Sequence, residues 1–266
     1  MARGLTPRER ARVAQLRDAH RFGADFHNAV MSEALANKAA FHFNGRGAQN
    51  RFCDAAVRLV AKHFAASGRG GADVTGRVRS LAIIVGTCPA VNVSSIFAPS
   101  VLAPMPRAAR IVDDTLNGGF IDYLAALTES IGDTPTANDA YAVSAAYVAA
   151  ADGDGALLAG DVAVVAGAAA ISDASTTQWQ YAESMFWWGW LQRVVGVVKA
   201  DVGGCAAGAA AGFLGAMSNH WEHYGIDDAI NTCSIGASAA SLTAWGSSGG
   251  GGSGGTGGGD DDGRIS

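Results

Sequence analysis

The residues with the clearest potential for chemistry are two histidines, His220 and His223, with Glu222 between them. Histidines three residues apart share a helix face and can bind one metal ion, with Glu222, Asp227 or Asp228 as a third ligand. The set lacks the His-Glu-x-x-His spacing of zinc peptidases and has no distal partner. We therefore favour a polar cluster at a helix end. His220 and His223 remain metal-ligand candidates, and no cofactor is expected.

A second group consists of His20 and His27, which lie seven residues apart with Asp25 near them. A histidine beside a carboxylate can transfer protons near neutral pH. No nucleophile accompanies the pair, so a satisfied or exposed histidine is the favoured interpretation. Asp152-Gly153-Asp154-Gly155 opens like a calcium loop, but the twelfth position is Ala163 where an EF-hand needs Glu. No catalytic residue is proposed.

Composition favours a helical protein with an uneven charge distribution. The chain of 266 residues is rich in Ala and poor in β-branched alternation. Residues 1–51 hold nine Lys and Arg against four acids, a net charge of +5, which leaves −10 for the rest of a chain of net charge −5. A basic first helix could contact phosphates or anionic lipid. The favoured interpretation is a solvent-exposed helix face whose positive charge balances the acidic remainder of the chain. Nucleic acid is not an expected partner.

Cysteine usage and the N-terminus bear on the compartment. The four cysteines have no CxxC pair and no metal-type spacing. A chain of this size needs no disulfide framework, but one or two bridges are compatible with export. The first twenty residues are charged throughout and show no apolar signal region. The expected location is the cytoplasm, or an exported state reached by a dedicated route.

Hydrophobic periodicity predicts a series of helices. Thr6-Pro7-Arg8-Glu9 has the pattern of a capping box with proline at the first helical position. Residues 74–86 fit either a short strand or a helix end. Residues 68–72 form a possible joint, and the prolines of 87–106 predict irregular structure. We expect helices over 7–21 and 24–41, either separate or merged across Gly23. Further helices are expected over 48–67, 119–131 and 137–151, followed by an apolar helix over 162–171 and a short final helix from Asp227 to about Ala240.

The remaining segment is the one around which we expect the fold to be organised. Ser172-Asp173 is predicted to cap a helix that begins near Ala174 and carries an aromatic block further along. Small residues then recur at every fourth position, so they share one helix face and form a groove that a second helix can approach at backbone distance. The predicted groove comprises Gly196, Ala200, Gly204, Gly208, Gly212 and Ala216.

The aromatic block and the groove raise the question of a membrane. Trp187, Trp188 and Trp190 cannot all enter one small core from one helix, so they are candidates for an aromatic anchor at a membrane or a partner. The uncharged stretch 202–219 is near the lower length limit for a span. Its few strongly apolar residues and the charges at Lys199 and Asp201 make autonomous insertion unfavourable. Association within a helical assembly is the expected behaviour.

Three stretches carry a resemblance to a known group of sequences: Phe26-His27-Asn28, Ser172-Asp173-Ala174-Ser175, and above all Asp201-Val202-Gly203-Gly204-Cys205-Ala206-Ala207-Gly208. Together they resemble uncharacterised bacterial proteins whose Gly/Ala repeats are similar to those of double-glycine-type bacteriocins. The resemblance touches about a third of the chain. It implies no catalytic residue, and the chain lacks a leader ending in Gly-Gly near residue 20.

The sequence therefore predicts a mainly α fold, an irregular multi-helix bundle around a glycine-grooved helix. The helical domain is expected over 5–245, followed by a disordered Gly/Ser/Asp tail over 246–266. The preferred function is a non-enzymatic bacterial protein, bacteriocin-like in a loose sense, whose small-residue helix mediates self-assembly or membrane association. The expected partner is a second copy, another helical protein or a membrane surface. The alternatives are a soluble helical interaction or scaffold protein, and, more remotely, a metal-dependent enzyme.

Overall fold

The computed structural model describes residues 4–69, 73–89, 111–112, 114–134, 137–183, 190–217 and 223–248. The fold is mainly α, as predicted. In chain order its elements are α1 (Pro7–Ala19), α2 (Phe22–Ala36), the 3₁₀ helix η1 (Lys38–Phe41), α3 (Ala48–Ala66), α4 (Val74–Ile84), β1 (Ile111–Val112), α6 (Phe120–Gly132), α7 (Ala137–Gly153), α8 (Ala159–Glu183), α9 (Trp190–Met217), β2 (His223–Tyr224) and α10 (Ile226–Ser248).

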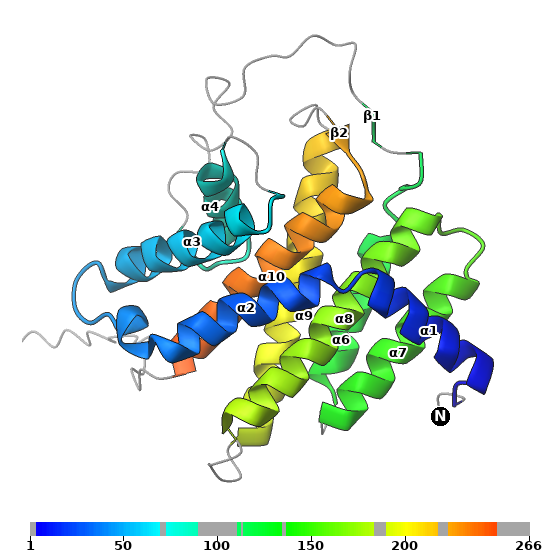
Figure 1. The fold of residues 1–266 in the computed structure, drawn as a ribbon, viewed down its shortest axis with the longest axis horizontal. Helices are drawn as coiled ribbons and strands as arrows, with labels where there is room; N and C mark the ends of the chain where they lie inside the picture. Colours follow the sequence, from blue (N-terminus) through cyan, green and yellow to red (C-terminus); the bar gives the residue numbers. More distant parts are fainter. Residues whose placement is uncertain are drawn as a thin grey trace, which may run out of the picture.

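Helices α9 and α10 run through the middle of the molecule, with α3 and α4 on one side and α1, α6 and α7 on the other (Figure 1). Two groups of buried apolar side chains fill the interior. One lies mainly among α2, α3 and α4, and the other among α1, α6, α7 and α8. Both groups take residues from α9 and α10, so this helix pair joins the two halves of the core.

Helix starts follow from local side-chain chemistry. The capping box before α1 is present: the Thr6 amide donates to Glu9 Oε2 at 2.6 Å, and the Glu9 amide donates to Thr6 Oγ1 at 3.3 Å. Asp161 in the first turn of α8 accepts hydrogen bonds from the amides of Leu158 and Gly118. The N-terminal half of α8, which is otherwise apolar, therefore tolerates a fully buried carboxylate in its first turn.

A short parallel pairing joins two distant segments. Ile111 and Val112 of β1 pair with His223 and Tyr224 of β2. The pairing places β2 directly before α10, and the Tyr224 side chain is fully buried beneath it.

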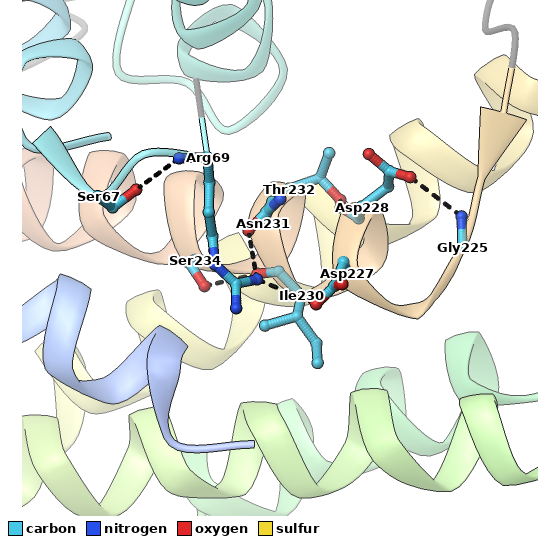
Figure 2. Close-up of polar contacts among 9 residues, drawn as sticks. All are labelled: Ser67, Arg69, Gly225, Asp227, Asp228, Ile230, Asn231, Thr232 and Ser234. Carbon is cyan, nitrogen blue, oxygen red and sulfur yellow. Dashed lines mark hydrogen bonds and ion pairs between the residues drawn. The ribbon is translucent and has the colours of Figure 1, made fainter. Parts of the chain in front are cut away.

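Arg69 fixes the end of the α3 segment to the start of α10 (Figure 2). Its Nη1 lies 3.0 Å from Asp227 Oδ1 and 3.4 Å from Asn231 Oδ1, and its guanidinium lies 4.0 Å from the centre of the Phe22 ring. The Gly225 amide donates to Asp228 Oδ2 at 3.1 Å, which closes the first turn of α10. At the start of α10, Asp227 thus pairs with Arg69 and Asp228 caps the first turn.

Several predicted boundaries are wrong. Ser172 and Asp173 do not begin a helix, because α8 runs unbroken through them to Glu183. The predicted helix 24–41 divides into α2 and η1. Residues 74–84, for which a short strand and a helix end were both open, form helix α4. The final helix continues to Ser248, past the predicted end at about Ala240. Residues 90–106 of the irregular segment and the tail beyond Ser248 lie outside the described residues.

Candidate functional site: the α9–α10 hairpin and its polar core

Helices α9 and α10 lie against each other at backbone distance. A Cβ added at Gly204 would overlap the carbonyl oxygen of Gly236 and lie 2.6 Å from the Ala240 Cβ. A Cβ at Gly208 would overlap the Thr232 carbonyl oxygen, and one at Gly236 would overlap the Gly204 carbonyl oxygen. Only glycine fits at these three positions without moving one helix away from the other.

A disulfide lies inside the same interface. Cys205 of α9 and Cys233 of α10 are bonded, and both are fully buried. The bridge and the glycine contacts therefore hold the pair as one disulfide-linked hairpin. A second bridge joins Cys53 of α3 to Cys88, shortly after α4. Every cysteine in the chain takes part in one of these two bridges.

The connection end of the hairpin is filled by Tyr224. A Cβ at Gly212 would lie 2.6 Å from the Tyr224 ring, so the groove continues to this position. The Tyr224 hydroxyl donates to the Ala209 carbonyl oxygen at 2.9 Å and lies 3.0 Å from Thr232 Oγ1. Burial raises the pKa of this hydroxyl, so Tyr224 stays protonated across the physiological range.

The predicted groove residues therefore fall into two groups. Gly204, Gly208 and Gly212 lie against α10 or Tyr224, and Ala216 is buried. Gly196 is exposed and a Cβ there would meet nothing within 4 Å, while Ala200 is half-buried. The groove is thus occupied from Gly204 onward by the protein's own last helix.

A fully buried polar cluster joins α9 to α2 and α8. Asp201 Oδ2 lies 3.2 Å from His27 Nε2, and neither side chain has any exposed surface. The Ser175 hydroxyl of α8 donates a short hydrogen bond to the same Asp201 oxygen. The other imidazole nitrogen, Nδ1, lies 3.3 Å from Asn28 Oδ1. Both ring nitrogens thus face oxygen atoms, an environment that suits a protonated imidazolium.

Electrostatics agree with this geometry. Burial alone would lower the pKa of His27, but the charge and hydrogen bond of Asp201 together with the contact to Asn28 raise it above its usual value. His27 does not contact Asp25, contrary to the sequence-based hypothesis, because Asp25 pairs with Arg21 on the surface of the same helix. Burial lowers the pKa of His20, and the nearby Asp227 carboxylate offsets this effect only in part.

A second ion pair, with a buried Arg17 and a half-buried Asp173, connects α1, α7 and α8. Arg17 Nη1 lies 2.8 Å from Asp173 Oδ2, and both groups contact the Ser144 hydroxyl at 2.7 and 3.1 Å respectively. Burial raises the pKa of Asp173 to about 6, even though Arg17 and Ser144 act in the opposite direction. The two polar clusters lie within one turn of each other along α8, at Asp173 and Ser175.

The remaining candidates from the sequence are the aromatic block, the histidine pair and the Asp152–Gly155 turn. Trp187, Trp188 and His220 lie outside the described residues. For Trp190 at the start of α9 and His223 in β2, the structure describes the backbone alone. Within the described part of the chain, no group of three or more His, Cys, Asp or Glu side chains is arranged to hold a metal ion. The Asp152–Gly155 turn is used internally, since Asp152 pairs with Arg12 and Asp154 accepts from Tyr123.

One helix among the described residues, over Val194–Ala216, has the length and mean hydropathy (1.4) of a membrane span. Half of its 18-residue window is buried inside the protein, and the central helix of a soluble bundle passes the same test.

Comparison of the chain with protein families, with curated proteins and with solved structures gives no match.

Proposed function

We propose that this is a non-enzymatic bacterial protein, bacteriocin-like in a loose sense, that associates with membranes through its α9–α10 hairpin. The observation that carries the proposal is the construction of that hairpin. Residues 202–217 of α9 and 229–248 of α10 contain no Asp, Glu, Lys or Arg. The two helices contact each other through glycine backbones, the mode of packing that stabilises helix pairs in lipid, where apolar burial gives little driving force.

The dimensions of the hairpin fit a bilayer approximately. The uncharged part of α9 is about 24 Å long at the α-helical rise, compared with a hydrocarbon core of about 30 Å. The charged groups stand at its ends, with Asp201 at one end and Asp227 and Asp228 near the other. Insertion as a linked pair also keeps the glycine contacts and every backbone hydrogen bond within the helices.

The two disulfides support export. Such bridges form and persist in oxidising compartments and are rare in a reducing cytoplasm. Cys205 and Cys233 are fully buried, so their bridge is protected once the bundle has formed. We therefore extend the proposal to a protein that acts outside the cytoplasm of the cell that makes it.

A soluble helical interaction or scaffold protein is the second candidate, and one observation favours it. The glycine groove is already filled by α10, and half of the apolar window of α9 is buried in the bundle. In that case the hairpin is the core of a stable soluble fold. Self-assembly through the groove would require α10 to leave it, so we do not propose assembly by that route.

Flotation with liposomes separates the two candidates. Purified full-length protein with both disulfides closed is mixed with neutral or anionic vesicles and centrifuged through a density gradient. Light scattering without lipid gives the oligomeric state. The proposal predicts that protein floats with vesicles. A monodisperse protein that stays at the bottom with every lipid composition would contradict it and leave the soluble bundle.

A further inference from the structure

One end of the molecule combines exposed cations with aromatic rings. It lies where α2 ends, η1 and α3 begin, and the C-terminal end of α10 arrives (Figure 1). We call this surface the basic aromatic tip and define it by the exposed cations Lys38, Arg46 and Arg51 and the rings Phe41, Phe43, Phe52 and Trp245.

Aromatic contacts hold the tip together. The Phe41 ring lies 6.1 Å from that of Phe52 and 5.9 Å from that of Trp245, edge to face in both pairs. A Cβ added at Gly246 would lie 2.7 Å from the Phe52 ring, so the end of α10 packs closely on α3. Phe43, Phe52 and Trp245 are each only half-buried, so apolar ring surface remains open to solvent beside the cations.

Arg51 shapes the loop before α3. Its guanidinium donates to the carbonyl oxygens of Asn44 at 2.8 Å and Arg46 at 3.1 Å, and it lies 5.8 Å from the centre of the Phe43 ring. Gly45 and Gly47 both have φ of 78°, a conformation that lets the chain curl around the guanidinium. The cation is thus fixed at the surface together with an aromatic ring.

Acidic side chains are missing from the segments that build the tip. Residues 34–53 contain Lys38, Arg46 and Arg51 and no Asp or Glu, and residues 229–248 of α10 contain no charge. The nearest carboxylates along the chain are already paired: Glu33 lies 2.7 Å from Lys62, and Asp54 lies 2.7 Å from Arg79. Among the residues that the structure describes, no ion pair joins Lys38, Arg46 or Arg51 to a carboxylate, so these segments present a local excess of positive charge on a chain of net charge −5.

We infer that the basic aromatic tip is the surface that docks on anionic lipid headgroups. Lys and Arg near an anionic surface attract phosphate and carboxylate headgroups, and half-buried rings favour the interfacial layer. The tip rests on the proposed membrane association, because it would bring the end of α10, and with it the α9–α10 hairpin, to the bilayer. Helix α1, whose arginines are the other candidates for contact with anionic lipid, lies on the opposite side of the α9–α10 pair (Figure 1).

The test uses two matched double variants of the full-length oxidised protein in flotation with vesicles containing phosphatidylglycerol. Lys38→Gln with Arg46→Gln removes two exposed cations of the tip. Arg8→Gln with Arg10→Gln removes two cations of α1 and changes the net charge equally. At about 1 kcal/mol per cation, the tip variant is expected to bind roughly 30-fold more weakly, and the α1 variant like wild type. Unchanged thermal melting of both variants confirms that the fold is intact.

Three outcomes would overturn the inference. If both variants bind as wild type does, membrane association stands but the tip is not the docking surface. If both lose affinity equally, net charge rather than the tip governs binding. If the wild type floats with no vesicle, the proposed function fails as well. Retention of a single-stranded oligonucleotide by the wild type and not by the tip variant would then assign the tip to nucleic acid.

Discussion

Asp201 of α9 and His27 of α2 form an ion pair with an Oδ2–Nε2 distance of 3.2 Å inside a core where neither side chain reaches solvent. Two charges buried together cost desolvation, and their attraction compensates only while both are present. The pair also receives the Ser175 hydroxyl, so it links three helices at one point. It is therefore a polar contact that connects α9 to α2 and α8 inside the core.

Removing one member of this pair should be costly. We expect His27→Ala to lower the free energy of unfolding by about 3–5 kcal/mol, because Asp201 would be left as a buried carboxylate without a counter-ion. Urea unfolding followed by circular dichroism measures the effect. Arg21→Ala, which breaks an ion pair exposed by about two-thirds on the same helix, serves as the control and should cost less than about 1 kcal/mol. Equal effects of the two substitutions would show that the buried pair has no special role.

The glycine contact predicts opposite effects for the same substitution at two positions of α9. Gly208→Ala should destabilise the protein by about 1–3 kcal/mol, because the added Cβ overlaps the Thr232 carbonyl oxygen. Gly196→Ala should stabilise it by about 0.5–1 kcal/mol, because that position is open and alanine favours helix. Thermal melting compares them, and the larger Gly208→Leu should disrupt folding. Equal effects at both positions would contradict close packing of α9 on α10.

The disulfide between α9 and α10 should contribute to stability. Replacing Cys205 and Cys233 together by alanine opens a loop with a sequence separation of 28 residues, for which the chain-entropy relation gives about 3–4 kcal/mol. Reductant should lower the denaturant midpoint of the wild type more than that of the double variant, which has only the Cys53–Cys88 bridge left to lose. A thiol assay on unfolded, unreduced wild type should find no free cysteine. Four free thiols in protein purified from an oxidising compartment would contradict the bridges.

The raised pKa of Asp173 predicts a defined pH dependence. Its folded value of about 6 exceeds the usual 3.8, so the folded state binds a proton more tightly than the unfolded state between these values. Stability from this group is therefore present at about pH 4 and lost as the pH rises through 6, by up to about 3 kcal/mol. The variant Asp173→Asn lacks this loss, so its stability relative to wild type should rise between pH 4 and 7. A stability difference between Asp173→Asn and wild type that stays constant from pH 4 to 7 would contradict the raised pKa of Asp173.

His27 also has a raised pKa, so its contribution to stability has the same dependence on pH. Protonated His27 is stabilised in the folded state, so its contribution is complete below its unfolded pKa near 6.5 and disappears as the pH rises through its folded value. His20, whose pKa is lowered by burial, acts in the opposite direction. The contribution of His27 is therefore read from the difference between wild type and His27→Gln at alkaline and mildly acidic pH, which should be smaller at alkaline pH.

Local patterns predicted much of the fold. The Thr6–Glu9 capping box and the apolar periodicity of α3 and α6 are short-range signals, and the structure confirms the helices that they predict. The predicted helix start at Ser172 and Asp173 is wrong, because residue types that cap helices also serve as side-chain partners inside a fold. Asp173, for example, pairs with Arg17. Nothing within a few residues distinguishes these two uses.

The core of the candidate site could not be predicted in the same way. The spacing of Gly204, Gly208 and Gly212 indicated a groove, but not that α10 fills it. The pairing of His27 with Asp201 spans 174 positions of sequence (201 − 27), and no periodicity connects them. One signal was available: a lone Asp next to a long uncharged helical stretch requires a partner when it is buried, and His27 is a titratable residue on an otherwise apolar helix face.

The most direct measurement of the central claim is the environment of α9 when the protein meets lipid. A fluorophore such as NBD is attached at Leu214→Cys, where the native side chain is 59% exposed, in protein whose native disulfides are closed. If the hairpin enters the bilayer, NBD emission shifts to the blue on addition of anionic vesicles and is quenched by nitroxides on lipid acyl chains. Emission that stays unchanged and unquenched while the protein floats with the vesicles would contradict the claim, because the bundle would then bind lipid with its hairpin still closed inside it.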